Sequence, residues 1–155
     1  MRFGLLFLIS LLTACSSTEA PRYSYDKAKR GSVEQLISYS KSLLGTPYKY
    51  GGSSPQTGFD CSGYVGHVFN KIAGISLPRN AAQISQHGYP VKFSQLREGD
   101  MVFFDINDQS YSHVGIYLGN GRFIHAPSSG GSVRVENMKL DYWKKHYNGA
   151  RRITF

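Results

Sequence analysis

One cysteine and two histidines in this chain could together carry out nucleophilic catalysis, because a thiol nucleophile needs a base to take its proton. Cys61 follows Asp60, a residue type that commonly caps helix N-termini, so we expect Cys61 in the first turn of a helix. Backbone N–H groups and the helix dipole favour an anion there, which predicts a lowered pKa for the thiol. A small core cysteine is the alternative. We favour the nucleophile.

His113 and His125 are the candidate bases, because each interrupts an otherwise apolar or small-residue segment that is typical of a strand. The loop 119–121, Gly-Asn-Gly, predicts a hairpin between the two segments. A two-residue turn would place the histidines on opposite faces of the sheet. A longer loop with a left-handed last glycine pairs Leu118 with Arg122 and puts both imidazoles on one face, within reach of each other. We predict this second register.

In that register the three residues form a Cys-His-His triad. Cys61 attacks an amide carbonyl, His113 takes up and returns the proton, and His125 orients His113. The Cys61 backbone N–H is a natural oxyanion donor, and the Tyr50 hydroxyl is either a second donor or a packing group. A cysteine with two histidines can also hold zinc with one open position, but a cysteine at a helix start argues against it. We expect no metal and no other cofactor.

The remaining histidines are expected to have structural roles. His67 follows Cys61 on the same helix at a spacing that turns it away from the thiol. His87 precedes Gly88 and is expected to interact with a helix C-terminus. His146 stands beside two lysines on what we expect to be a solvated face.

The elements that must position these residues follow from hydrophobic spacing. Ser32 and Gln35 form a capping-box pattern for a first helix that ends at Gly45, and a second helix runs from Cys61 to Gly74. The other expected elements are a short helix from Asn80 to about Gln86, strands at 101–104, 113–118, 122–126, 132–135 and 151–155, and a helical or turn segment at 142–147. Helices followed by strands predict an α+β fold, with N-terminal helices packed on a central antiparallel sheet.

Composition limits the class of protein. The chain has 155 residues, of which 41% are hydrophobic, a net charge of +8 and two cysteines. The length fits one domain, and the apolar content excludes a disordered chain. Two cysteines cannot build a disulfide framework. The positive charge predicts anionic surroundings such as nucleic acid, phospholipid or an acidic polymer.

The first residues are typical of an exported lipoprotein. Arg2 precedes an apolar run at 3–12 that is too short to span a bilayer, which is the pattern of a signal peptide. The ending Leu12-Thr13-Ala14-Cys15 resembles the lipobox of bacterial lipoproteins, in which the signal is cut before the cysteine and the cysteine is lipidated. We therefore expect a signal peptide at 1–14, a lipidated Cys15 with a flexible tether through residue 31, and a catalytic domain at 32–155.

The lipid anchor sets the expected location and partners. Ser16 after the cysteine resembles the outer-membrane sorting pattern of Gram-negative bacteria, which predicts an anchored protein facing the periplasm. Several acyl chains, palmitate among them, anchor a protein stably. An unpaired thiol in such an oxidising space is a liability unless it is used, which favours Cys61 as a nucleophile. We expect a monomer that contacts the membrane and binds no nucleic acid.

Six short motifs in chain order resemble the NlpC family of papain-like cell-wall cysteine endopeptidases. They are Tyr50–Gly52, Asp60–Val65, Leu77–Arg79, Gly99–Phe104, His113–Tyr117 and Phe123–Ala126. The resemblance implies a papain-like α+β fold and hydrolysis of amide bonds in peptidoglycan stem peptides next to diaminopimelate, either at the γ-D-glutamyl bond or at the D-alanyl crosslink. It also implies that Cys61, His113 and His125 are the catalytic residues.

The same resemblance implies a substrate groove lined by Tyr50, Asp60, Ser62 and Arg79. Arg79 could bind a stem carboxylate bidentately or pair with Asp60, and both interpretations stay open. Family members often carry Ser or Thr soon after the Pro-Arg pair, whereas this chain has Asn80. The alternative functions are a non-catalytic wall-binding lipoprotein and an amidase or acyltransferase on the same scaffold.

Overall fold

A computed structural model describes residues 32–129 and 131–155 of the chain. The expected signal peptide, the lipidated Cys15 and the tether that follows it lie outside the described residues. In the part that is described, no helix is both long enough and apolar enough to cross a bilayer.

The described elements begin with helices and continue as strands. In chain order they are α1 (Val33–Ser42), β1 (Ser53–Ser54), β2 (Gly58–Phe59), α2 (Cys61–Ala73), α3 (Ala81–Ile84), β3 (Tyr89–Val91), a 3₁₀ turn (Phe93–Gln95), β4 (Met101–Ile106), β5 (Gln109–Tyr117), β6 (Arg122–His125), β7 (Arg134–Asn137), α4 (Asp141–His146) and β8 (Tyr147–Arg152).

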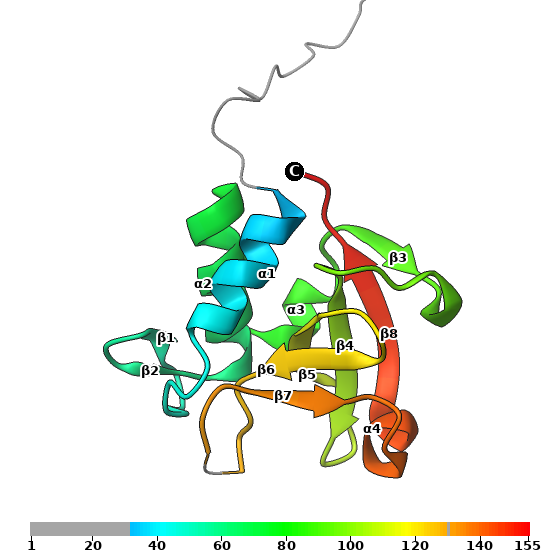
Figure 1. The fold of residues 1–155 in the computed structure, drawn as a ribbon. Coiled ribbons are helices and arrows are strands. Elements are labelled where there is room, and N and C mark those ends of the chain that lie inside the picture. Colours follow the sequence, from blue (N-terminus) through cyan, green and yellow to red (C-terminus); the bar gives the residue numbers. More distant parts are fainter. Residues whose placement is uncertain (1–31, 130) are drawn as a thin grey trace, which may run out of the picture.

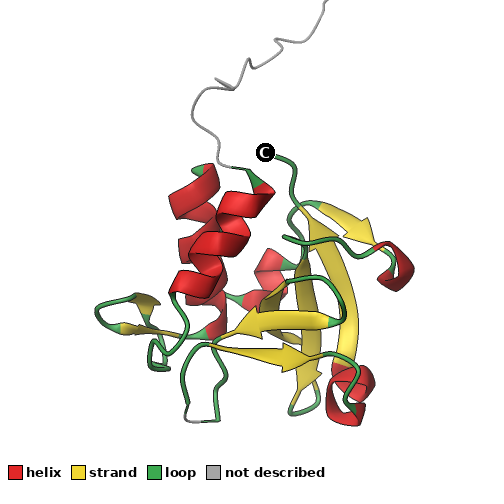
Figure 2. Cartoon of the chain, viewed as in Figure 1, coloured by secondary structure: helices red, strands yellow, loops and turns green. Residues whose placement is uncertain are grey.

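Within the described residues, six strands form an antiparallel sheet in the order β3-β8-β4-β5-β6-β7, and β1 pairs with β2 in a separate small hairpin. Figure 1 shows α1 and α2 side by side to the left of the sheet, with α4 at the lower end of β8. The longer helices (red) are grouped beside the strands (yellow) in Figure 2. Helices packed on a central antiparallel sheet confirm the expected α+β fold class.

The sequence signals at the helix ends act as expected. Ser32 and Gln35 form a complete capping box at the start of α1. Asp60 caps α2, so Cys61 is its first residue, and Gly74 ends the helix in a left-handed conformation. Asn80 caps α3, but that helix ends at Ile84, two residues before the expected Gln86.

The sheet is buried on both faces because successive side chains of its central strands point alternately into two apolar clusters. Met101 and Phe103 of β4 pack in the larger cluster with the helices, whereas Val102 and Phe104 pack in a smaller cluster with Trp143 of α4. A strand that is buried on both faces reads as a continuous apolar run, as the Met-Val-Phe-Phe sequence does. The smaller cluster encloses part of the candidate site.

The sequence prediction is less accurate at the end of the chain. The strand expected at 151–155 lies instead at Tyr147–Arg152, and the one expected at 132–135 lies at Arg134–Asn137. The apolar residues Ile153 and Phe155 pack against the helix-side cluster rather than pairing as a strand. Polar residues fill much of β8, which pairs with β4 and β3, so backbone hydrogen bonding rather than hydrophobic alternation defines this strand.

Candidate active site

Asp60 holds the start of α2 and the preceding loop together. Its Oδ1 accepts a hydrogen bond of 2.6 Å from the backbone N–H of Gly63, which is the helix cap. Its Oδ2 accepts from the backbone N–H of Gly51 at 3.0 Å and from the Arg79 guanidinium at 3.1 Å. One carboxylate thus fixes the helix turn that carries Cys61 and the loop that faces it.

Arg79 pairs with Asp60, so the ion-pair interpretation is the one that the geometry matches. The same terminal nitrogen also donates to the carbonyls of Gly51 and Gly52, each at 3.2 Å. Ser62 is buried, with its hydroxyl 2.9 Å from the Arg79 carbonyl. The expected groove residues Asp60, Ser62 and Arg79 therefore bond to one another.

This network requires the loop to approach the helix very closely. A Cβ on Gly63 would lie 2.0 Å from the carbonyl oxygen of Gly52, a distance that no side chain can occupy. Gly63 therefore lets the loop pack directly on the first turn of α2, and the backbone N–H of Asp60 donates to the same carbonyl at 3.1 Å. The Asp-Cys-Ser-Gly sequence places its glycine where the backbone contact occurs.

The two candidate histidines lie on one face of the β5–β6 hairpin, as predicted. The N–H of Leu118 donates to the carbonyl of Arg122 at 2.8 Å, and the register continues as Ile116 opposite Ile124. His113 Nε2 lies 2.6 Å from His125 Nδ1. The longer, bulged hairpin loop is therefore confirmed, and with it the predicted contact between the imidazoles.

A glycine next to the histidine pair makes room for it. A Cβ on Gly115 would lie 2.8 Å from the carbonyl oxygen of Ile124 and 3.2 Å from the His125 Cβ. The imidazoles are covered by the smaller apolar cluster, in which Trp143 stacks on His113 and meets His125 edge to face. His113 is 5% exposed and His125 is fully buried. That Trp143 would cover the pair was not predicted from the sequence.

Burial sets the protonation of the site. It lowers the pKa of His113 to about 4 and that of His125 to about 2, with the positive charge of Arg134 contributing to both. Burial also raises the pKa of the Cys61 thiol to about 11, and the negative charge of Asp60 adds to this effect.

The expectation of a lowered thiol pKa was therefore wrong. Backbone N–H groups, including those of Ser62 and Val114, do stabilise the thiolate, but desolvation outweighs them. A neutral thiol beside a neutral imidazole is the form that these shifts favour at neutral pH.

The cysteine and histidine halves meet at one hollow of about 500 Å³. Its lining includes Cys61 from α2 and His113 from β5, and the expected groove residues are among the rest: Tyr50, Asp60, Ser62 and Arg79. Residues 52 positions apart in sequence are thus brought to one opening by packing α2 against β5. The arrangement brings together a candidate nucleophile and a candidate base, and His125 contacts that base.

Comparison with known proteins agrees with this arrangement. The family model of the NlpC/P60 family matches residues 45–152, a span that contains α2 and all six strands of the large sheet. The chain belongs to the NlpC/P60 family.

Its relatives include named cell-wall enzymes. Murein DD-endopeptidase MepH of Escherichia coli strain K12 is 37% identical over 150 residues, which are 94% of this chain and 54% of MepH. Bifunctional muramidase/DL-endopeptidase CwlT of Bacillus subtilis strain 168 is 42% identical over 134 residues, which are 82% of this chain and 39% of CwlT. The chain thus spans about half of MepH and less of CwlT.

The fold also matches a solved structure. An NlpC/P60 family protein from Bacillus cereus ATCC 10987 superposes with a TM-score of 0.74 at 34% identity, covering 79% of this chain and 40% of that one.

Sequence reasoning missed one tyrosine of this NlpC/P60 site. Tyr50 is 87% exposed, so its interpretation as a packing group is wrong, although it does line the hollow. Tyr48 lines the same hollow and is half-buried, and after desolvation the charge of Cys61 is the main cause that raises its pKa. Its backbone N–H donates to the carbonyl oxygen of Gly131 at 2.8 Å, and this hydrogen bond anchors the residue. Because Tyr48 is less exposed than Tyr50 and its backbone is hydrogen-bonded, Tyr48 is the better candidate for an oxyanion donor.

The other histidines are structural, as expected, with one difference. The Nε2 atom of His67 lies 2.8 Å from the Tyr39 hydroxyl, and Nδ1 of His87 lies 3.1 Å from the carbonyl of Gln83 in the last turn of α3. His146 does not stand free on a solvated face, because Nδ1 contacts the backbone carbonyl of Asp105. Over residues 32–129 and 131–155, no three His, Cys, Asp or Glu side chains are grouped to hold a metal ion.

Proposed function

We propose that this chain is a peptidoglycan endopeptidase that hydrolyses amide bonds of stem peptides next to diaminopimelate, with Cys61 as nucleophile. The observation that carries the proposal is that Cys61 and His113 open onto the same hollow while His125 holds His113 from behind. MepH and CwlT, which are named as DD- and DL-endopeptidases, support the reaction and the substrate class.

The contact between the imidazoles determines which atom of His113 serves as the base. Nε2 of His113 faces Nδ1 of His125, which leaves Nδ1 of His113 for the thiol. A base at Nδ1 requires the proton of neutral His113 to sit on Nε2, so Nε2–H donates to His125 Nδ1. His125 then carries its own proton on Nε2, an atom with no hydrogen-bond partner among the described residues. The pair thereby fixes one productive tautomer.

The reaction proceeds through a thioester. His113 Nδ1 takes the proton of Cys61, the thiolate adds to the amide carbon, and the carbonyl electrons move to oxygen. The oxyanion lies near the Cys61 backbone N–H and a tyrosine hydroxyl. When it collapses, the C–N bond breaks and the departing nitrogen takes the proton from His113. Water then adds to the thioester, with His113 again accepting and returning one proton as the carboxylic acid and the thiol form.

The neutral resting pair makes thiolate formation depend on bound substrate. Proton transfer from Cys61 to His113 creates two opposite charges in a desolvated site, which is unfavourable until the negative charge passes to the oxyanion. His125 stabilises the transient imidazolium by accepting from its Nε2–H. The site thus couples charge formation to attack on the substrate.

We also propose that the enzyme acts while lipid-anchored through Cys15, facing the periplasm from the outer membrane. The support is the apolar run at 3–12, the lipobox-like ending at Cys15 and the following Ser16. Metabolic labelling with a palmitate analogue should mark the wild type and not Cys15→Ala, and fractionation should place the labelled protein in the outer membrane. Label that persists in Cys15→Ala would contradict the anchor.

Mass spectrometry of defined muropeptides tests the proposed reaction. We expect the wild type to convert a crosslinked dimer or a tetrapeptide monomer into fragments whose masses name the cleaved bond, and Cys61→Ala to release none above background. Equal melting temperatures of the two proteins provide the control for folding. Binding of muropeptides without turnover by the wild type would instead favour a wall-binding protein.

A matched pair of tyrosine variants tests the oxyanion donor. Tyr48→Phe is expected to lower kcat about a hundredfold, as loss of one oxyanion donor commonly does. Tyr50→Phe removes the same hydroxyl from an exposed neighbour and should leave kcat within about twofold, since a surface hydroxyl makes no such bond. A larger loss of kcat in Tyr50→Phe than in Tyr48→Phe would instead indicate that Tyr50 is the oxyanion donor.

A further inference from the structure

A second hollow, of about 550 Å³, continues the site on the far side of the histidine base. It shares His113, Ile106, Asn107 and Ser128 with the first hollow, so the two adjoin at the base. Cys61 lines the first hollow but not the second, whereas Arg134, Glu136, Tyr142 and Trp143 line the second but not the first. A substrate attacked at Cys61 can therefore extend past His113 into a pocket with a different lining.

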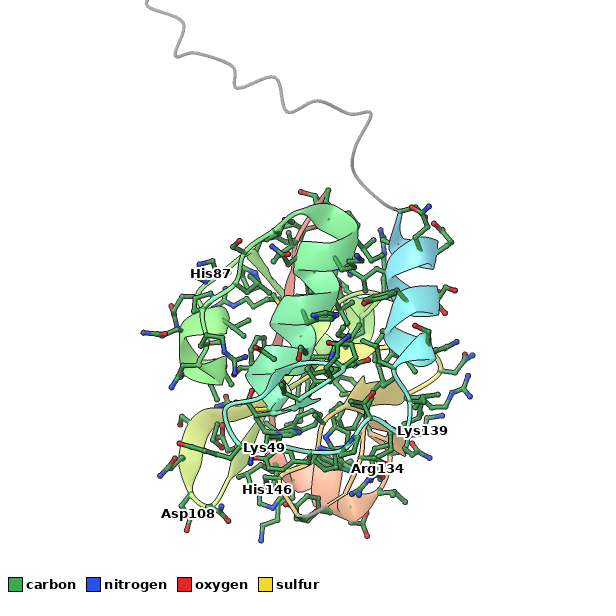
Figure 3. All side chains as sticks on the ribbon, turned by 90° about the vertical axis from the view of Figure 1, so that its left-hand side faces the viewer. Lys49, His87, Asp108, Arg134, Lys139 and His146 are labelled. Carbon is green, nitrogen blue, oxygen red and sulfur yellow. The ribbon has the colours of Figure 1, made fainter. Side chains whose placement is uncertain are left out.

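Arg134 gives this second hollow a fixed positive charge. The residue lies on β7 directly opposite His125 in the register, and Figure 3 labels it in the lower part of the view, beneath the helices. Its Nε donates to the carboxylate of Glu136 at 2.7 Å. Among the described residues no acceptor takes the remaining N–H groups of the guanidinium. The side chain remains 45% exposed, so a ligand can reach these donors.

Glu136 orients this guanidinium without using its terminal nitrogens. Because it bonds to Nε, the two terminal nitrogens are left as donors in one plane. Arg79 on the first hollow differs, since its terminal nitrogen is already bonded to Asp60 and to two loop carbonyls. Of these two arginines, Arg134 is the one whose geometry suits a carboxylate from outside.

The positions of Cys61 and His113 determine which half of the substrate can reach Arg134. The acyl half becomes bonded to Cys61 and so stays in the first hollow, whereas the departing amine must take its proton from His113. Because His113 stands at the border between the hollows, the leaving half extends from that border into the second one.

We propose that Arg134 binds the carboxylate carried by the carbon atom next to the departing amine, and so selects the leaving half of the substrate. The inference rests on the proposed endopeptidase function and deepens it. In a D-alanyl crosslink, the leaving diaminopimelyl centre carries a free carboxylate beside the amine. In the γ-D-glutamyl bond of a tetrapeptide stem, the corresponding carboxyl is tied up in the next amide. Arg134 therefore favours cleavage of crosslinks over cleavage within one such stem.

Two synthetic crosslinked substrates test this assignment, one with a free carboxylate at that carbon and one with a primary carboxamide. At pH 8, where His113 and His125 are neutral, we expect the wild type to cleave the carboxylate substrate with a kcat/KM about tenfold or more above that of the carboxamide substrate, because of a charge-assisted hydrogen bond. Arg134→Gln should lose about this factor on the carboxylate alone. The kcat/KM of Arg134→Lys on the carboxylate substrate should lie between those of the wild type and Arg134→Gln, since lysine keeps the charge but lacks the paired donors of the guanidinium.

A neighbouring arginine provides the matched control. Arg122 is exposed on β6 and lines neither hollow, so Arg122→Gln removes the same charge and should not change the preference. Equal losses on both substrates in Arg134→Gln, or no loss on either, would overturn the inference while leaving the endopeptidase function intact. A wild type that cleaves neither substrate nor any other muropeptide would instead overturn the proposed function, and the inference with it.

Discussion

The two halves of the site are held in place by different forces. On the cysteine side, polar bonds dominate: the Asp60 carboxylate joins the α2 cap, the loop at Gly51 and the Arg79 guanidinium. On the histidine side, strand register and aromatic burial dominate, because His113 and His125 bond to each other beneath Trp143. The proposed nucleophile is thus positioned by charged groups and the proposed base by burial away from water.

This difference favours the neutral forms of both Cys61 and His113. The aromatic cover lowers the pKa of His113, and burial together with the Asp60 charge raises the pKa of Cys61. Each half therefore opposes formation of the thiolate–imidazolium pair that the proposed mechanism requires. We expect mutations to separate the two halves, since loss of polar bonds should affect the cysteine side and changes in packing should affect the histidine side.

The largest effect that distinguishes the halves is the pH dependence of stability. The unfolded chain protonates His113 below its ordinary pKa of 6.5, whereas the folded chain resists protonation down to about 4. Unfolding free energy is therefore lost as the pH falls through this window, by about 3 kcal/mol for this residue. Urea unfolding at pH 7 and pH 4.5 measures the loss, and His113→Asn should show a smaller one. Identical losses in both proteins would contradict the desolvated base.

A pair of glycine substitutions tests the packing on the histidine side. Gly115→Ala places a Cβ 2.8 Å from the Ile124 carbonyl oxygen, so the strands must separate, at a cost of about 1–3 kcal/mol. Gly66→Ala in α2 meets no atom within 4 Å and is expected to stabilise the helix by up to about 1 kcal/mol. Urea unfolding gives both values. A Gly115→Ala protein as stable as the wild type, with full activity, would show that the close approach is not needed.

On the cysteine side, Asp60→Ala is expected to lower the unfolding free energy by about 1 kcal/mol, because the helix loses its cap. Asp60→Asn keeps a capping oxygen and should cost less, while removing the negative charge that raises the pKa of Cys61. Alkylation of Cys61 at pH 8 should therefore be faster in Asp60→Asn than in the wild type. Asp141→Asn, on an exposed pair with Lys144, is the control and should change neither quantity. Unchanged alkylation in Asp60→Asn would contradict the role of this charge.

The sequence was informative where local rules act. Asp60 and Gly74 predicted both ends of α2. The Gly-Asn-Gly loop at 119–121 allowed two registers, and the predicted one, which brings the histidines together, is the one observed. These predictions succeed because caps and hairpin loops are determined by the residues beside them.

The features that sequence reasoning missed depend on contacts between distant segments. Tyr48 and Tyr50 are indistinguishable by type, and pairing with Gly131 is what holds Tyr48 at the hollow. The raised pKa of Cys61 comes from burial under the assembled fold, which opposes the local helix effect that the sequence does show. Arg134 gave no local signal either, because its importance comes from the register that places it opposite His125.

The central claim is that Cys61 carries the acyl half of the substrate as a thioester. Intact-protein mass spectrometry after acid quench of a reaction with a crosslinked muropeptide tests it most directly. We predict a transient mass increase equal to the mass of the substrate minus the mass of the departing amine, mapped to Cys61 by peptide digestion and absent in Cys61→Ala. Turnover by the wild type with no adduct, together with cleavage that persists in Cys61→Ala, would contradict the account.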